Sequence, residues 1–204
     1  MKSAFVWMAT AVAIGAVLAR TDVPVRAQTA GEPLRLSAWA VSMGTTATGA
    51  NAVIDIRINK WSTDKEREEL IATFLDKGQD GLLNRLQKAP EKGRLSIPGR
   101  TGPDPTQTRL GWTLRYAMQW PGEDGGKRIM IATDRVMTFA EVQQKPRSYD
   151  YPFTFIEIHL NKDGEGEGKM AVATQLQFDK KKNTIVFENY SSEPVRLNQI
   201  KVTK

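Results

Sequence analysis

Few residues of this chain could carry out catalysis. The chain contains one histidine, His159, and no cysteine. A catalytic nucleophile needs a base within hydrogen-bond reach, so Cys/His chemistry is impossible and a Ser/His arrangement has one candidate base. Glu157 and His159 are two residues apart and share a strand face, where they could polarise a water molecule or bind a ligand. Two polar residues in this pattern more often mark a solvent-facing strand than a catalytic pair. We therefore assign no catalytic residue and keep a hydrolase that uses this pair as an alternative.

Metal and cofactor sites have equally little support. Zinc sites are built mainly from cysteine and histidine, which this sequence nearly lacks. Asn161, Asp163 and Glu165 alternate as oxygen ligands do in the first half of a calcium loop. The later acidic ligand of such a loop is missing, and a glycine-rich hairpin explains the same residues. The sequence predicts no cofactor and no metal site, and leaves calcium binding by the loop 163–168 open.

Aromatic residues supply the better candidates for ligand binding. Exposed tryptophan rings on a β-scaffold could stack on sugars, and a cleft lined by Trp112, Tyr116 and Trp120 could take an apolar ligand. These three residues alternate with polar ones over 111–120, so the pattern also fits a core-facing strand. Trp39 and Trp61 lie on the polar side of their patterns, which makes them the better surface candidates.

The strands that must position these residues show period-2 hydrophobic alternation. Short polar breaks separate the last runs, which favours an antiparallel meander because parallel neighbours need long crossovers. The predicted strands are 34–41, 52–59, 93–97, 111–120, 128–133, 136–142, 153–160, 169–178, 184–190 and 195–202.

One helical insertion interrupts the strands. Thr63 and Glu66 fit a capping box, helical spacing follows, and Gly78 is a plausible stop. A second short helix ends before Pro90. This hairpin is expected over one edge or end of the sheet, as a packed cap or as a lid. The fold class is therefore mainly β, in the α+β range: an antiparallel sandwich or partly closed barrel with one inserted helical hairpin.

The N-terminus is typical of a signal peptide. Lys2 precedes an apolar run over 4–19, and Val25 and Ala27 are small residues at a cleavage site. The run is too short for a membrane-spanning helix. We therefore expect a signal peptide over 1–27 and a single β-rich domain over 28–204, exported to the periplasm or the medium, with no transmembrane segment after processing.

The distribution of charge argues against nucleic acid as a partner. The formal net charge is +6, but lysines and arginines are interspersed with acids, and export also argues against nucleic-acid binding. We expect a non-enzymatic binding or interaction module. Its partner could be a glycan, an apolar small molecule or another envelope protein.

Three segments also carry a resemblance. Ile-Ala-Thr-Asp-Arg at 131–135, Tyr-Pro-Phe-Thr-Phe-Ile-Glu-Ile at 151–158 and Gly-Glu-Gly-Lys at 166–169 resemble segments of small exported bacterial β-rich proteins that are uncharacterised. The resemblance covers the C-terminal half of the chain. It implies a bacterial envelope setting and no particular activity.

Overall fold

The computed structural model describes residues 31–41, 51–98, 111–122, 125–135, 153–172, 175–179, 184–188 and 195–203, without side chains for 172–194. The predicted signal peptide and the strand expected over 136–142 lie outside these residues. The barrel strands are β1 (Leu34–Val41), β2 (Asn51–Ile58), β3 (Gly93–Ser96), β4 (Trp112–Pro121), β5 (Lys127–Thr133), β6 (Thr154–Leu160), β7 (Glu165–Val172) and β10 (Val195–Thr203).

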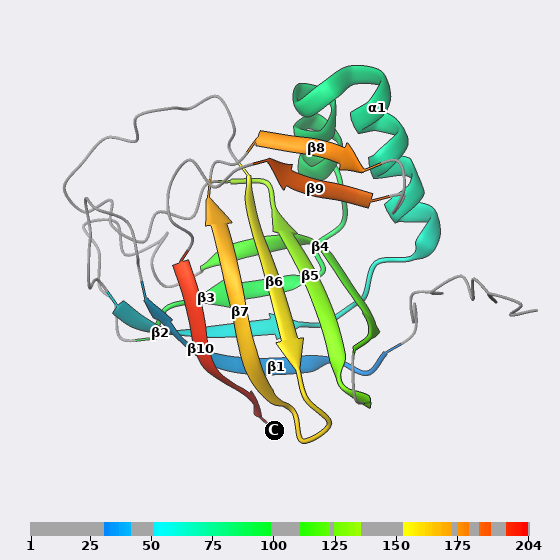
Figure 1. Cartoon of the computed structure of the whole chain (residues 1–204). Helices are drawn as coiled ribbons and strands as arrows, with labels where there is room; N and C mark the ends of the chain where they lie inside the picture. Colours follow the sequence, from blue (N-terminus) through cyan, green and yellow to red (C-terminus); the bar gives the residue numbers. More distant parts are fainter. Residues whose placement is uncertain are drawn as a thin grey trace, which may run out of the picture.

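These eight strands form a closed antiparallel barrel in the order β1-β10-β7-β6-β5-β4-β3-β2 (Figure 1). Each strand pairs with its neighbour in the chain, and β10 closes the barrel by pairing with both β7 and β1. The prediction of a mainly β, antiparallel fold is confirmed. A sandwich is not, because one continuous closed sheet takes its place. Two further strands, β8 (Gln175–Asp179) and β9 (Thr184–Glu188), pair only with each other.

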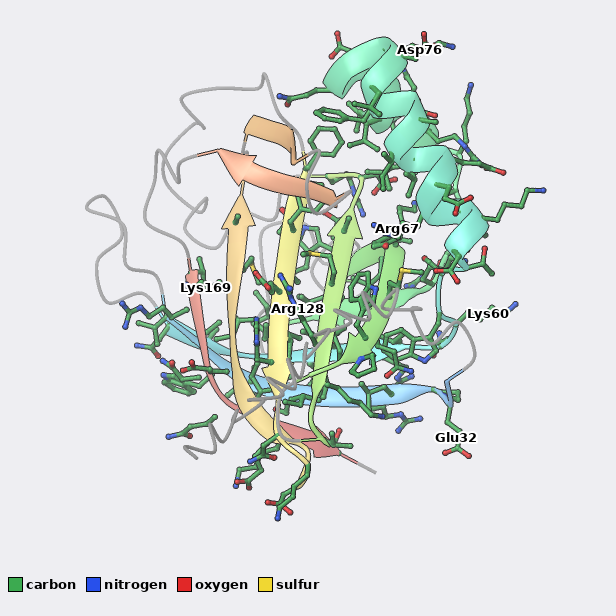
Figure 2. The ribbon with its side chains drawn as sticks, turned by 45° about the vertical axis from the view of Figure 1, so that its right-hand side comes forward. Glu32, Lys60, Arg67, Asp76, Arg128 and Lys169 are labelled. Carbon is green, nitrogen blue, oxygen red and sulfur yellow. The ribbon has the colours of Figure 1, made fainter. Side chains whose placement is uncertain are left out.

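Helix α1 (Asp64–Gln87) is inserted between β2 and β3. Its predicted capping box is confirmed: Thr63 accepts the amide N–H of Glu66 at 3.2 Å, and Glu66 accepts that of Thr63 at 2.8 Å. Gly78 has φ 64° and breaks the helix, so the predicted helical pair is present as two segments of one kinked element. Figure 2 shows α1 rising from the Lys60 end of the barrel to a turn near Asp76. In the described part of the chain, no helix is long and apolar enough to span a membrane.

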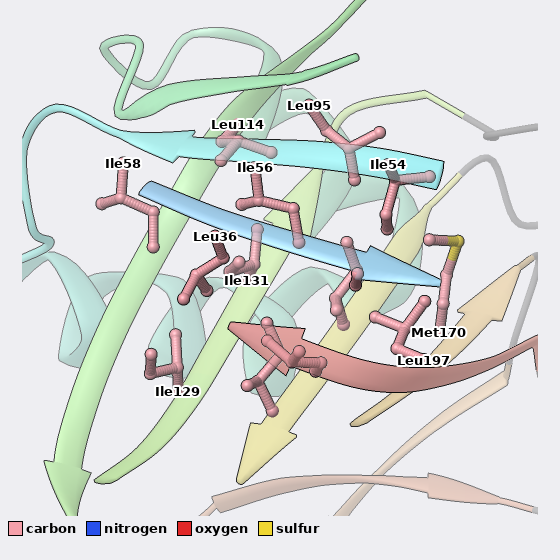
Figure 3. Packing of buried hydrophobic residues seen from close by; sticks show 14 of the residues in the cluster. Leu36, Ile54, Ile56, Ile58, Leu95, Leu114, Ile129, Ile131, Met170 and Leu197 are labelled. Atoms are coloured by element: carbon pink, nitrogen blue, oxygen red, sulfur yellow. The ribbon is translucent and has the colours of Figure 1, made fainter. Parts of the chain in front are cut away.

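Branched apolar side chains fill the barrel. Ile54, Ile56 and Ile58 of β2 point inward and are at most 1% exposed, as their alternation predicts. They meet Leu114, Ile129, Ile131, Met170 and Leu197 from the other strands (Figure 3). An eight-stranded barrel is just wide enough for side chains to fill. The interior is therefore the main hydrophobic core.

A β-bulge in β4 divides the predicted aromatic face. Leu114 pairs with Thr133 of β5 and Tyr116 with Ala132, so the register shifts at Arg115. Leu114 consequently points into the barrel, whereas Tyr116, Met118 and Trp120 lie on its outer side. The expectation that Trp112 shares a face with Tyr116 and Trp120 is wrong, because the extra residue reverses the alternation. Tyr116, Met118 and Trp120 belong to a second apolar cluster, which α1 covers.

The location expected for the helical insertion needs a related correction. A closed barrel has no free edge, and α1 packs on the outer face of the barrel wall. Leu82 and Leu86 of α1 are buried against Met118, Phe153 and Phe155. The bulge creates an apolar surface on this outer face, which explains why α1 covers this face.

The strand predicted over 169–178 is wrong in its bounds. Strand β7 starts at Glu165, within the expected break, and β8 is a separate strand that starts at Gln175. The glycines explain the difference: a Cβ on Gly166 would lie 1.8 Å from the carbonyl oxygen of His159. Glycine in a strand often marks such a close backbone approach. The glycine-rich segment is thus part of the barrel wall.

Replacing Ile56 by alanine should lower the free energy of unfolding by about 2–5 kcal/mol, because a fully buried side chain leaves a cavity inside the barrel. Val53 lies on the same strand but is 39% exposed. Its replacement by alanine should cost less than about 1 kcal/mol. Urea denaturation measures both values, and equal losses would contradict the β2 register.

Candidate functional site

A pocket between α1 and the outer wall of the barrel is the candidate site. Its volume is about 80 Å³, and its lining is mostly apolar. Leu70 and Ile71 line it from the helical segment before Gly78, and Leu82 and Leu86 from the segment after it. The kink thus lets both segments contact one patch of the barrel.

The barrel side of the pocket comes from three adjacent strands. Strand β4 provides Tyr116 and Trp120, β5 provides Met130 and Ala132, and β6 provides Phe155. All five side chains belong to the outer apolar cluster or pack against it. Ala132 is the smallest of these side chains, so it leaves space between larger neighbours. The pocket is therefore a gap in the packing between helix and barrel.

Two polar groups lie at this otherwise apolar site. Arg67, in the first turns of α1, lines the pocket (Figure 2). Burial raises the pKa of the Tyr116 hydroxyl above its usual range, although the charge of Arg67 opposes this shift. The hydroxyl stays neutral and donates a hydrogen bond to Sδ of Met118 at 3.0 Å. Asp64 and Glu66 lie close enough for their negative charges to add to the rise in the pKa of Tyr116. Among the residues that line the pocket, Arg67 alone is charged.

Polar contacts anchor the N-terminal end of α1. The amine of Lys92 donates to both carboxylate oxygens of Glu66, at 2.7 and 2.8 Å, and its side chain is only 7% exposed. Burial disfavours the charged form of Glu66, but the hydrogen bonds from Lys92 and Thr63 outweigh it and lower the pKa of this carboxyl. Ser62 exchanges hydrogen bonds with the backbone of Ala117 in β4.

The bulge residue holds the other end of the helix. Arg115 donates to the carboxylate of Asp134 at 2.9 Å and to the carbonyl oxygen of Ala89 at 3.0 Å. Ala89 lies two residues beyond the end of α1. Both ends of the cover are thus attached to the barrel, with the pocket between them.

The structure brings the predicted pair Glu157 and His159 together, and neither residue lines the pocket, although Glu157 is directly opposite the lining residue Met130. Nε2 of His159 lies 3.0 Å from Oε1 of Glu157, and Arg128 donates to the same oxygen at 2.8 Å. Burial opposes ionisation of Glu157, yet the charge of Arg128 and these hydrogen bonds lower its pKa. His159 is largely exposed (61%), and neither member of the pair bonds to a hydroxyl group among the described residues. The arrangement is a surface ion-pair cluster, and sequence reasoning missed Arg128.

The described tryptophans outside the pocket are Trp39, Trp61 and Trp112, and they differ in exposure. Trp39 is 41% exposed, as expected for a surface candidate. The same expectation for Trp61 is wrong: its ring is buried against the interior core, and its Nε1 donates to the carbonyl oxygen of Glu32. Trp61 follows the end of β2, where strand alternation no longer applies. Trp112 packs against the barrel interior and does not line the pocket, because it precedes the bulge.

The possible calcium loop is mainly a turn followed by a strand. The side-chain oxygen of Asn161 accepts the backbone N–H groups of Asp163 and Glu165, at 2.9 and 3.0 Å. This Asx-type turn connects β6 to β7. Among the described residues, no three acidic or histidine side chains are grouped as metal ligands.

Comparisons with known protein families, with curated proteins and with solved structures found no match to this chain. Functional inference therefore depends on the geometry of its own residues.

Glu66→Gln should destabilise the protein at neutral pH by about 1–3 kcal/mol, because it removes the charged partner of Lys92. The wild-type protein should lose this contribution as the pH falls from above the ordinary glutamate pKa of 4.5 through the lowered pKa of Glu66. The variant should lack that part of the pH dependence. Denaturant unfolding at several pH values measures it, with Glu68→Gln on the exposed side of α1 as control. Parallel profiles for Glu66→Gln and the wild type would contradict the role of this pair.

Proposed function

We propose that this chain is a non-enzymatic exported binding module that holds a small apolar ligand between α1 and the barrel. The observation that carries the proposal is the apolar pocket formed by Leu70, Leu82, Tyr116, Ala132 and their neighbours. Ligand sites are typically concave and apolar, with few polar groups. The aromatic residues Tyr116 and Trp120, which the sequence suggested for such a ligand, both line the pocket.

The size of the pocket restricts the ligand. Drug-sized molecules occupy sites of roughly 300–1,000 Å³, whereas this pocket measures about 80 Å³. A single ring or a short acyl chain is the matching class of ligand. Gly78 offers a hinge at which the two segments of α1 could separate to admit it, because glycine tolerates a change of backbone angles.

Arg67 supports an anionic group on the ligand. It is the permanently charged residue among the side chains of the pocket. A short fatty acid or aromatic carboxylate could place its apolar part against Trp120 and Phe155 and its carboxylate near Arg67. Apolar contact would then supply most of the affinity, and the arginine would supply orientation.

Octanoate should bind this pocket when α1 opens at Gly78, because its chain is longer than the closed volume of about 80 Å³ can hold. The uncharged counterpart 1-octanol should bind in the same way. Arg67→Gln should weaken octanoate binding about 3–10-fold, as expected for loss of one partly exposed charge-assisted contact, and change octanol binding less than about twofold. Calorimetric titration measures the affinity of each variant for both ligands.

Ala132→Ile should prevent binding of both ligands, because the larger side chain fills the pocket from the barrel side. Ala72→Ile, on the exposed side of α1, is the matched control and should bind as the wild type does. Cooperative unfolding of each variant verifies the fold. Unchanged octanoate binding by Ala132→Ile would contradict the location of the site.

Export is supported by the sequence of residues 1–27 and is tested separately. In a bacterial host, N-terminal sequencing of the exported fraction should find a mature protein that begins near Gln28. Ala27→Asp should block cleavage and leave an unprocessed precursor, whereas Ala30→Asp should be processed normally. An exported protein that retains Met1 would contradict the proposed signal peptide.

A further inference from the structure

Three arginines form one row across the barrel wall made of β1, β2 and β3. Arg35 is directly opposite Arg57, and Arg57 is directly opposite Arg94. All three are exposed. Directly opposite side chains on neighbouring strands have Cβ atoms roughly 4.5–5.5 Å apart, and like charges at such positions repel. Arg57, in the middle, has an arginine on each side.

The acidic residues nearby only partly compensate this row. Glu91 accepts a hydrogen bond from Arg94 at 3.1 Å. Asp55 lies in the next row, where its register partners are Ser37 and Ser96. Within the part of the chain that the structure describes, Arg35 and Arg57 form no salt bridge. The barrel itself thus gives no counter-charge within the row to the two guanidinium groups.

A groove follows the arginine row. Its volume is about 610 Å³, within the range typical of ligand sites. The three arginines line it together with Ser37, Ser96 and Thr203, and with the acidic residues Asp55 and Glu91. The charged lining thus has three cations and two carboxylates, and Glu91 is already paired with Arg94. Guanidinium groups bind carboxylate, sulfate or phosphate through paired hydrogen bonds, and hydroxyl groups suit a polyhydroxylated ligand.

An exposed aromatic ring lies on the same face. Trp39 is four residues beyond Arg35 on β1, about 13 Å at the usual strand rise of 3.3 Å per residue. Its neighbour on β2 is Val53, which is also exposed. A tryptophan ring can stack on the apolar face of a sugar. The wall therefore combines anion-binding groups with a stacking ring at a distance that spans several sugar units.

We propose that the outer face of β1, β2 and β3 binds an acidic polysaccharide, with Arg35, Arg57 and Arg94 contacting its anionic groups and Trp39 stacking on a sugar ring. This site is distinct from the apolar pocket, which lies over β4, β5 and β6. The ligand neutralises a row of like charges, so binding also stabilises the folded barrel.

The test uses hexagalacturonate as the acidic glycan and its fully methyl-esterified form as the neutral control. The wild-type protein should bind hexagalacturonate saturably, more weakly at high salt, and at least tenfold more tightly than the ester. Arg57→Gln should lower the affinity at least tenfold without lowering the melting temperature, because it removes repulsion within the row. Lys127→Gln, at an exposed position on β5 outside the groove, should bind as the wild type does.

Trp39→Ala should lower the affinity for the acidic glycan and for its ester by about fivefold or more, because stacking does not depend on charge. Equal affinity for the two glycans, or unchanged binding by Arg57→Gln, would overturn the proposal. So would tighter binding of a single-stranded oligonucleotide of the same charge. Octanoate binding should be unaffected by Arg57→Gln, which separates this site from the pocket beneath α1.

Discussion

The β-bulge at Arg115 is the constraint on which the arrangement of the molecule depends. An eight-stranded barrel has limited interior volume, and branched residues such as Ile56 and Ile131 already fill it. The extra residue in β4 turns Tyr116 and the large side chains after it outward, where they form a second apolar surface. Such a surface is costly to leave in water, so the chain has to cover it, and α1 is that cover. The side chain of Arg115 then binds the backbone just beyond the end of the same helix. One local irregularity thus both creates the surface and helps to hold its cover.

The attachment of α1 is uneven along its length. Polar contacts from Lys92 and Arg115 hold its two ends, and buried leucines such as Leu86 hold its second segment. The middle contains Gly78, whose backbone angles interrupt the helical hydrogen bonds. In the proposed function, the segment before Gly78 moves away from the barrel while the contacts of Lys92, Arg115 and Leu86 are kept. That mechanical property follows from where the charged and apolar contacts lie, and it suits a pocket better than a continuous packed interface would.

Local features of this fold could be predicted from the sequence, and long-range features could not. Alternation identified β1 and β2 with their buried faces, and the Thr63 capping box marked the start of α1, because each depends on residues close in the chain. The bulge at Arg115 leaves no mark in composition, so the environments of Trp112 and Tyr116 could not be separated. Trp61 was misassigned because a residue beyond a strand end is placed by tertiary packing. The row of Arg35, Arg57 and Arg94 depends on the register of three strands and becomes visible only when they are paired.

A filled interior determines where this barrel can bind anything. Small barrels that carry a ligand often hold it inside the sheet, but here Ile54, Leu114 and Met170 meet in the middle and are fully buried. The binding that we propose is consequently assigned to the outer wall, and the two sides of that wall differ in chemistry. Strands β4 to β6 expose apolar side chains to a helix, whereas β1 to β3 expose guanidinium and hydroxyl groups. The outward-facing residues of β4 to β6 are themselves a buried apolar cluster, so changes there alter the packing of α1. The arginines of β1 to β3 are exposed, so changes there leave both apolar clusters intact. The two binding surfaces that we propose therefore lie on different strands of one barrel, and each depends on its own set of outward-facing residues.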